Sequence, residues 1–368
     1  MLNEKILKND EKAVYNLRSL YRRFGYSRFK MSKFEEYDLY VRNKDFLISD
    51  GIITFTDTNG RLLALKPDVT LSIIKNAKNV KGSVEKLYYN ENVYRISSDS
   101  HSFKEINQTG LECIGDVSLY DICEVFYLAV KSLENIDSNY IVDIAHAGLF
   151  SALIKECNLS NDIKGTVLES IRNKSIDEIT DIFRKGNIQQ PAYDIISKLM
   201  YAYKSSDELF AAFNGTSESV QQELEELLAI YRSAEDLGLT DKIRIDFSIV
   251  NDTSYYSGLV FKGYIFGIPT SVLSGGQYDK LMKKMGKTAG AVGFAVYLDA
   301  LERHGNTQTD YDYDFVILKD DSCASSQIIK TVESLSENGF SVIVLSELDS
   351  TIRYKTLMKL TKNGLEGA

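Results

Sequence analysis

The sequence predicts an α+β protein, in which a sheet-rich core is interrupted by a helical insertion and followed by a short α/β unit. Three observations lead to this prediction. Short β-rich runs fill much of residues 52–145 and return after residue 241. Residues 147–240 instead alternate apolar and charged side chains at helical period, without a strand-like run. From residue 315 onward, the chain reads as β, α, β and α.

These patterns place the elements as follows. A first helix has apolar residues at helical spacing and is closed by Gly25: Val14, Leu17, Leu20, Tyr21 and Phe24. Strands are expected at Ile52–Thr56, Leu62–Leu65, Val84–Arg95 and Phe103–Ile114, then a helix at Leu119–Leu133 and a strand at Tyr140–Ala145. After the insertion, which ends in amphipathic Glu218–Leu237, strands follow at Ile243–Phe247, Leu259–Phe266 and Ala291–Leu298, with a helix at Tyr278–Lys284.

The last part of the chain is expected to contain strands at Phe315–Leu318 and Ser341–Leu345, separated by a helix at Ser326–Asn338. A final helix is expected near Thr351–Leu360. The resulting domains are a core formed by residues 1–146 and 241–305, an insertion at 147–240, and a C-terminal α/β domain at 308–368.

Composition indicates a folded protein, since 44% of its 368 residues are hydrophobic and 26% are charged. No apolar run approaches the roughly 18 residues of a membrane span, and the polar start resembles no targeting peptide, so we expect a cytoplasmic protein. Four scattered cysteines and three histidines lack zinc-site spacing, so we expect no metal and no cofactor. The net charge of −9 argues against a broad nucleic-acid surface, and we expect neither nucleic acid nor membrane as a partner.

Polar residues on one expected strand indicate a ligand site. The alternation of side chains along a strand puts Gln108, Gly110 and Glu112 on the same face. A carboxylate and an amide on one face suit an ammonium or imidazole ligand, and Asp68 with Thr70 offers a second polar pair. For a single such pair, a water-facing strand is the more common explanation.

Several segments of the chain stand out as motifs. They are KPDVT (66–70), VYR and KEINQTGLE (93–95 and 104–112), YYSG (255–258), SGGQYDKL (274–281) and AVGFAVYLD (291–299). Taken together, they resemble the RP(E/D)xT segment, motif 2, the histidine-binding signature, the glycine-rich segment and motif 3 of histidyl-tRNA synthetases, which are class II aminoacyl-tRNA synthetases. The order and spacing of the motifs are kept over about residues 10–304. This resemblance implies a class II synthetase-like antiparallel sheet of six to seven strands, flanked by helices.

The resemblance also implies a histidine-binding pocket. In the family, the ammonium group and the imidazole ring of histidine are held by separate sets of side chains. The residue types at these positions suit histidine, although the aspartate is one methylene shorter than the glutamate of many synthetases. In this chain the positions are Asp68, Thr70 and Gln108 for the ammonium group and Glu112 and Tyr256 for the imidazole, with Arg95 and Tyr255 completing the expected set.

The nucleotide half of the site departs from the family. The family's acidic residue in motif 2 falls on Ser97, and three of its arginines fall on Ser102, Asn251 and Ala300, which leaves Arg95. Fixed guanidinium groups neutralise the phosphates during adenylate formation, and one such donor is often worth about 10²–10³ in rate. We therefore expect no catalytic residues and no adenylate-forming activity.

An amino-acid pocket kept beside a lost nucleotide site resembles the synthetase-like regulatory subunits of ATP phosphoribosyltransferase. Such subunits activate a short catalytic subunit in the first step of histidine biosynthesis and confer feedback inhibition by histidine. The resemblance implies a short-form catalytic subunit as partner, histidine as effector, and a homodimer within a hetero-oligomer. The C-terminal unit is also shorter than the anticodon-binding domain of a synthetase.

Two other functions remain open at this point. The chain is a divergent histidyl-tRNA synthetase, or another adenylate-forming relative, if the changed positions can be compensated. It is a docking module without a ligand if the pocket is vestigial; the retained Gln108, Glu112 and Tyr256 argue against this.

Overall fold

The computed structural model describes residues 7–43, 51–77, 82–96, 102–250, 255–301, 311–320, 322–362 and 364–367. The chain divides into two compact units, at residues 1–304 and 305–368. Among the described residues, no helix is long and apolar enough to cross a membrane.

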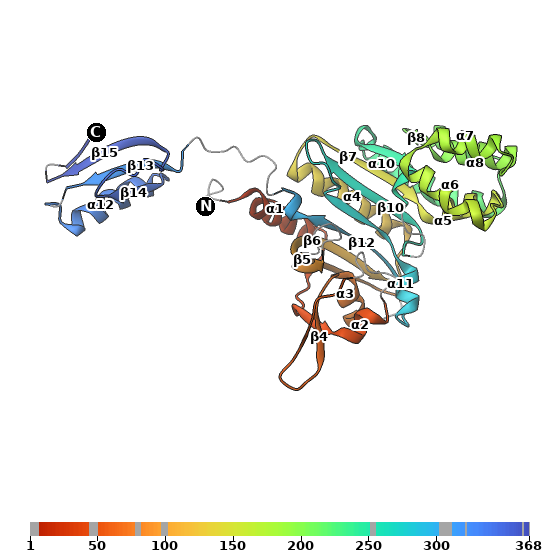
Figure 1. The fold of residues 1–368 in the computed structure, drawn as a ribbon, viewed down its shortest axis with the longest axis horizontal. Helices are drawn as coiled ribbons and strands as arrows, with labels where there is room; N and C mark the ends of the chain where they lie inside the picture. The colour runs from red at the N-terminus through yellow and green to blue at the C-terminus, as the bar shows by residue number, and fades with distance from the viewer. Residues whose placement is uncertain are drawn as a thin grey trace. The chain divides into compact units, whose positions relative to one another are not determined.

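A nine-stranded sheet forms the centre of the first unit (Figure 1). All neighbouring strands are antiparallel except the β1–β5 and β7–β9 pairs. The two strands at the edges have only two residues each, so seven longer strands make up most of the sheet. The order is β1 (Ser27–Arg28), β5 (Val84–Ile96), β6 (Phe103–Gly115), β12 (Gly290–Tyr297), β11 (Leu273–Gln277), β10 (Leu259–Ile265), β7 (Tyr140–His146), β9 (Ile243–Asp246) and β8 (Ala202–Tyr203).

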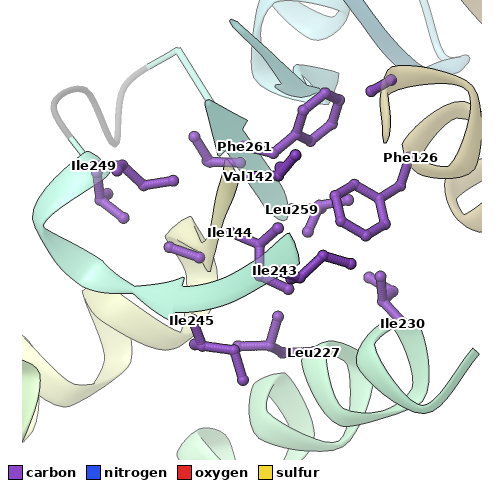
Figure 2. Packing of buried hydrophobic residues seen from close by; sticks show 14 of the residues in the cluster. Phe126, Val142, Ile144, Leu227, Ile230, Ile243, Ile245, Ile249, Leu259 and Phe261 are labelled. Carbon is purple, nitrogen blue, oxygen red and sulfur yellow. The ribbon is translucent and has the colours of Figure 1, made fainter. Parts of the chain in front are cut away.

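The larger apolar core lies on the sheet face covered by α1 (Asn9–Arg23), α4 (Leu119–Ile136) and α10 (Glu218–Asp236). Figure 2 shows Phe126 of α4 and Ile230 of α10 close to strands β7, β9 and β10. In α4 ten residues are buried, including the runs Glu124–Phe126 and Leu128–Val130, so most of the helix circumference lies in the core. Full burial of one apolar side chain contributes about 1.5–3 kcal/mol, so this layer stabilises the packing of the helices on the sheet.

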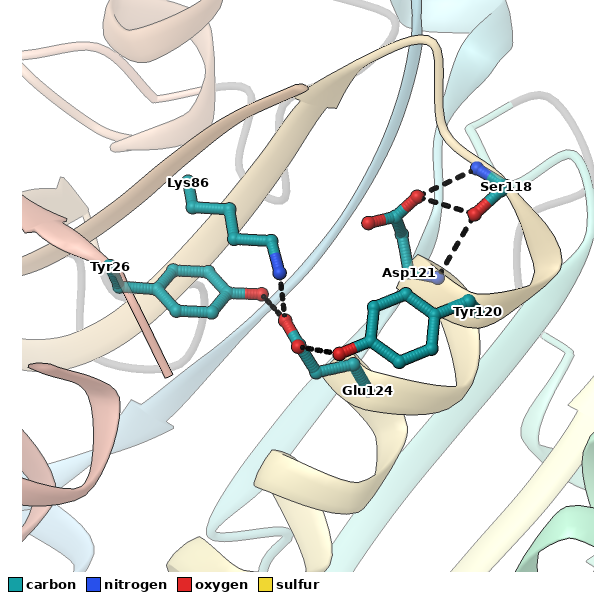
Figure 3. Close-up of polar contacts among 6 residues, drawn as sticks. All are labelled: Tyr26, Lys86, Ser118, Tyr120, Asp121 and Glu124. Atoms are coloured by element: carbon teal, nitrogen blue, oxygen red, sulfur yellow. Dashed lines mark hydrogen bonds and ion pairs between the residues drawn. The ribbon is translucent and has the colours of Figure 1, made fainter. Parts of the chain in front are cut away.

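A polar cluster fixes the start of α4 (Figure 3). The buried Glu124 carboxylate accepts hydrogen bonds from Lys86 Nζ at 2.5 Å, from Tyr120 at 2.7 Å and from Tyr26 at 3.3 Å. The N-cap residue, Ser118, accepts from the backbone of Asp121, whose carboxylate accepts from Ser118 in return. The lysine ties β5 to the helix, and the cap satisfies two of the backbone N–H groups at the helix start.

The opposite face of the sheet carries a second apolar cluster. It contains Leu87, Tyr89 and Val93 of β5, together with residues of three short helices and a small sheet. These are α2 (Tyr37–Val41), α3 (Thr70–Asn76), α11 (Asp279–Lys284) and the sheet β2 (Phe34–Glu36), β4 (Leu62–Leu65) and β3 (Thr54–Thr56).

The segment expected to be the helical insertion contains six helices, and each of them contributes buried residues to the larger core. It also contains β8, which pairs with β9, so the expectation of no strand in this segment is wrong by one two-residue strand. The helices are α5 (Ala147–Glu156), α6 (Asn161–Asn173), α7 (Ile176–Arg184), α8 (Gln190–Leu199), α9 (Ser206–Phe213) and α10.

The second unit is a four-stranded sheet with one helix among its described residues. Its order is β14 (Val342–Leu345), β13 (Tyr313–Lys319), β15 (Tyr354–Thr361) and β16 (Gly364–Gly367), with α12 at Ser325–Glu337. Strand β13 is parallel to both its neighbours, whereas β16 is antiparallel to β15.

Several elements differ from expectation, since strands β1, β2 and β16 and helices α2 and α3 were not expected. The helix expected near Thr351–Leu360 is wrong, because Tyr354–Thr361 is strand β15, in which Lys355 and Lys359 are exposed and Leu360 is buried. Strand β11 was not expected, because its glycine pair is unfavourable in a strand. The other expected strands and helices outside the insertion are present within a few residues of their expected ends.

Candidate functional site

A cavity of about 450 Å³ lies on the face of the large sheet that is opposite α1 and α4. This volume suits an amino-acid-sized ligand. All seven residues expected to bind histidine line the cavity, and several residues that were not expected join them. The lining consists of Asp68, Thr70, Tyr89, Arg95, Gln108, Glu112, Ile249, Tyr255, Tyr256, Lys262, Ser271, Ser274, Gly275, Gly276, Tyr278, Gly293, Phe294, Ala295 and Tyr297.

Alternation along β6 determines which side chains enter the cavity. Leu111 and Cys113 belong to the core beneath α1 and α4, whereas Gln108 and Glu112 point to the other face. The expectation that these two residues share a face is therefore confirmed. The pairing of β6 with β12 places Gly293 directly opposite Glu112.

Glycines on the floor make room for the polar side chains. A Cβ atom at Gly293 would overlap the carboxylate of Glu112. A Cβ atom at Gly276 would lie 2.7 Å from the ring of Tyr256. Any side chain at these two positions would displace groups expected to contact the ligand, which explains the glycines in motifs of otherwise β-forming residues.

Glu112 is the most deeply buried acid of the cavity, with 2% of its surface exposed. Its carboxyl group accepts a hydrogen bond from Thr70 Oγ1 at 3.0 Å and a short one from the hydroxyl of Tyr278. Burial raises the pKa of Glu112 to about 8, although both hydrogen bonds oppose the rise. At neutral pH this carboxyl is therefore mostly protonated, so it can donate a hydrogen bond or a proton to a basic ligand.

Asp68 and Arg95 lie together at another part of the wall. Asp68 accepts a hydrogen bond from the backbone N–H of Leu71 at 2.9 Å, at the start of α3. Burial raises the pKa of Asp68, whereas this hydrogen bond and the charge of Arg95 oppose the rise. Arg95 donates from Nε to the carbonyl of Pro67 at 2.9 Å, so part of its guanidinium is already used within the protein.

Aromatic rings form one wall of the cavity. Tyr255 and Tyr256 meet edge to face, with ring centroids 4.7 Å apart, and Tyr255 lies 6.0 Å from Tyr278. Burial raises the pKa of Tyr255 well above its usual value, so its hydroxyl stays protonated. Rings with protonated hydroxyl groups provide an apolar surface and hydrogen-bond donors for a flat, partly polar ligand.

Gln108 has a buried side chain that is 3% exposed, yet its amide has no hydrogen-bond partner among the described residues. The amide atoms reach the space of the cavity, because they are not among the fully buried polar atoms that lack a partner. Because Gln108 lines the cavity, a ligand can satisfy this amide.

The substituted nucleotide positions are placed only in part. Ala300 lies in the 3₁₀ helix Leu298–Leu301 and packs against the larger core, where it presents no charge. Ser102 is exposed and directly precedes β6. Ser97 and Asn251 lie outside the described residues.

Sequence reasoning missed six polar residues of the lining: Tyr89, Lys262, Ser271, Ser274, Tyr278 and Tyr297. Tyr278 lies within a quoted motif but was expected only to begin a helix. Lys262 and Tyr297 lie in strands that were expected. The sequence feature that could have indicated a role for Lys262 is a single charged residue within the otherwise uncharged strand LVFKGYI.

The chain resembles known proteins over nearly its whole length. It matches the histidyl-tRNA synthetase family model over residues 2–301. The ATP phosphoribosyltransferase regulatory subunit of Clostridium botulinum (strain 657 / Type Ba4) is 30% identical over 313 residues, which cover 80% of this chain and 73% of that protein. That of Clostridium acetobutylicum is 26% identical, with 98% and 92% covered.

Solved structures share the fold. An ATP phosphoribosyltransferase regulatory subunit/histidyl-tRNA synthetase from Bacillus halodurans superposes with a TM-score of 0.77 at 22% identity, covering 95% of this chain and 93% of that one. The ATP phosphoribosyl transferase (HisG:HisZ) complex from Thermotoga maritima contains a chain with a TM-score of 0.62 at 23% identity, covering 81% and 97%. The family match and the relative at 30% identity show that this chain belongs to the histidyl-tRNA synthetase family, within its group of ATP phosphoribosyltransferase regulatory subunits.

Proposed function

We propose that this chain is the regulatory subunit of ATP phosphoribosyltransferase and that it senses histidine in the cavity described above. In this role it performs no chemistry of its own. It activates a short catalytic subunit for the first step of histidine biosynthesis and transmits feedback inhibition by histidine. It acts as a homodimer within the hetero-oligomer, in the cytoplasm.

The proposal rests on a difference between the two halves of the site: the amino-acid half keeps the family's residue types, whereas the nucleotide half has lost them. On the amino-acid side, a protonated Glu112, the unpartnered amide of Gln108 and the tyrosine wall all line one cavity. On the nucleotide side, serine, asparagine and alanine stand where the family has arginine. A pocket for an amino acid without groups for its activation suits a sensor better than a synthetase.

The partner is inferred from the relatives. Eight curated relatives, at 24–30% identity, carry the name ATP phosphoribosyltransferase regulatory subunit. The Thermotoga maritima structure contains such a transferase as a complex of two kinds of chain. These names support a short-form catalytic subunit as the partner.

Feedback through this pocket requires two states of the complex with different affinities for histidine. A ligand that binds both states equally shifts nothing. A coupling of about 1–3 kcal/mol, or 5- to 150-fold in affinity, is typical of allosteric proteins. By linkage, the active state must bind histidine more weakly by the same factor.

The test is reconstitution with a short-form catalytic subunit. Phosphoribosyl transfer to ATP is measured with the catalytic subunit alone, with this chain added, and with histidine titrated into the mixture. We expect activation by the chain, then inhibition by histidine that Glu112→Ala relieves. Glu105→Ala, which removes an exposed carboxylate from the same strand, serves as the control and leaves inhibition unchanged.

The rival synthetase function has its own measurement. We expect no histidine-dependent exchange of pyrophosphate into ATP above background, because three arginines of the nucleotide half are missing. Measurable exchange, together with no activation of the catalytic subunit, would favour a divergent synthetase instead.

A further inference from the structure

Lys262 is a cation in the cavity wall that the proposed function does not yet use. It is the fourth residue of β10, and the residues before it in the strand are buried and apolar. Across the sheet it lies opposite Ser274 of β11, which also lines the cavity, and opposite Asp143 of β7. This register points its side chain to the ligand face of the sheet.

The charge of Lys262 has no close partner among the described residues, since it forms neither a hydrogen bond nor an ion pair there. Asp143 is the facing acid, but both of its carboxylate oxygens bind Arg244, at 2.7 and 2.9 Å. Burial lowers the pKa of Lys262, and the more distant charge of Asp143 opposes this only in part. A half-buried ammonium group without an acceptor is costly, and an anion in the cavity would relieve that cost.

The cavity also has two cations and two acids among its described lining: Arg95 and Lys262, Asp68 and Glu112. An α-amino acid brings both an ammonium and a carboxylate. Asp68 suits the ammonium, and Glu112 suits a basic side chain. Arg95 lies beside Asp68, and its Nε already donates to the Pro67 carbonyl, so part of its guanidinium is bound within the protein.

Lys262 reaches the cavity from a different strand. Strand β10 is three positions from β6 in the sheet order, and neighbouring strands are about 5 Å apart. The lysine stem is roughly as long as one of these spacings, so its ammonium can reach the position of Ser274 on β11. Two further spacings, or roughly 10 Å, separate β11 from β6, which carries Glu112.

The geometry points to Lys262 as the residue that binds the α-carboxylate of the amino acid in this cavity. This inference rests on the proposed function, because it takes histidine as the ligand. The carboxylate lies against Lys262 and Ser274, while the imidazole lies between Glu112 and Tyr256. Lys262 thereby makes the site selective for an amino acid over the corresponding amine.

The test compares histidine with histamine, which lacks only the carboxylate, by calorimetry. The wild-type chain should bind histidine more tightly than histamine. Lys262→Met should weaken histidine by roughly 10- to 150-fold, the loss expected for one charge-assisted hydrogen bond, and change histamine by less than about twofold. Lys262→Arg should keep the preference for histidine, and Lys283→Met, on the exposed face of α11, should change neither.

Each other outcome has a distinct meaning. Equal loss of both ligands in Lys262→Met would overturn the inference, since the lysine would then only support the pocket. Equal binding of histidine and histamine by the wild type would overturn it as well. If Lys262→Met weakens competition by inorganic phosphate but not binding of histidine, the cation serves a phosphate instead. Failure of the wild type to bind histidine at all would overturn the proposed function itself.

Discussion

Replacing Glu112 with glutamine should remove a pH-dependent loss of stability from the protein. Burial raises the pKa of Glu112 from 4.5 to about 8. A carboxyl group with a raised pKa in the folded state contributes fully at low pH and loses that contribution as pH rises toward the folded value. The window for this loss therefore runs from about pH 4.5 to pH 8. A glutamine keeps the shape, and its oxygen still accepts from Thr70, but it never ionises.

The magnitude follows from the two pKa values, because one pKa unit corresponds to 1.36 kcal/mol. Between pH 5 and pH 8, the wild type should lose about 3 kcal/mol of unfolding free energy that the Glu112→Gln variant keeps. All other titrating groups are common to both proteins, so the change in the difference between them isolates Glu112.

Urea unfolding, followed by tyrosine fluorescence, at pH 5, 6, 7 and 8 measures this quantity. The chain has 23 tyrosines and no tryptophan, so the signal comes from tyrosine alone. The wild-type and variant curves should diverge as pH rises, with the variant more stable at pH 8. A constant difference across this range would refute the reasoning, because Glu112 would then have an ordinary pKa and could not hold a proton for the ligand.

Three further outcomes follow from the packing and the site. Glu124→Ala should destabilise the protein by about 1.5–3 kcal/mol, because it leaves the half-buried Lys86 without its charged hydrogen-bond partner. Glu134→Ala, at an exposed pair of the same helix, should change stability by less than about 0.5 kcal/mol in the same denaturant assay. Gly293→Ala should weaken histidine binding by at least tenfold in calorimetry, since its Cβ atom would displace the Glu112 carboxylate; an unchanged affinity would mean that this acid does not contact the ligand. Tyr256→Phe should weaken histidine binding but leave activation of the catalytic subunit intact, as measured with and without histidine.

Local pattern was enough to predict the long antiparallel pair of the sheet. β5 and β6 are 13-residue runs that the sequence placed to within a residue or two, and the two-residue period of a strand put Gln108 and Glu112 on one face. Strand β11 could not be predicted this way. Its Gly275–Gly276 pair has low strand propensity and is required by the close approach of neighbouring groups, which only the folded sheet reveals.

The same limit applies to the second unit and to the site. Residues 354–361 alternate lysines with apolar residues at spacings that fit a helix or a strand, and pairing with β13 decides between them. The role inferred for Lys262 depends on strand pairing, because the register between β10 and β11 places it beside Ser274. Motif comparison identified the residues that match the family, and the structure added this one, which lies outside the motifs.

The central claim is that histidine controls the transferase through this cavity. The most direct test makes two measurements on each protein: the affinity of the isolated chain for histidine, and the histidine concentration that half-inhibits the reconstituted transferase. The proteins compared are the wild type and the variants Gln108→Ala, Glu112→Gln, Tyr256→Phe and Lys262→Met. We predict that both quantities shift together, each variant raising them by a similar factor, because binding and inhibition use the same pocket. If binding to the isolated chain weakens while inhibition keeps its wild-type midpoint, the sensing site lies elsewhere in the complex and the claim is contradicted.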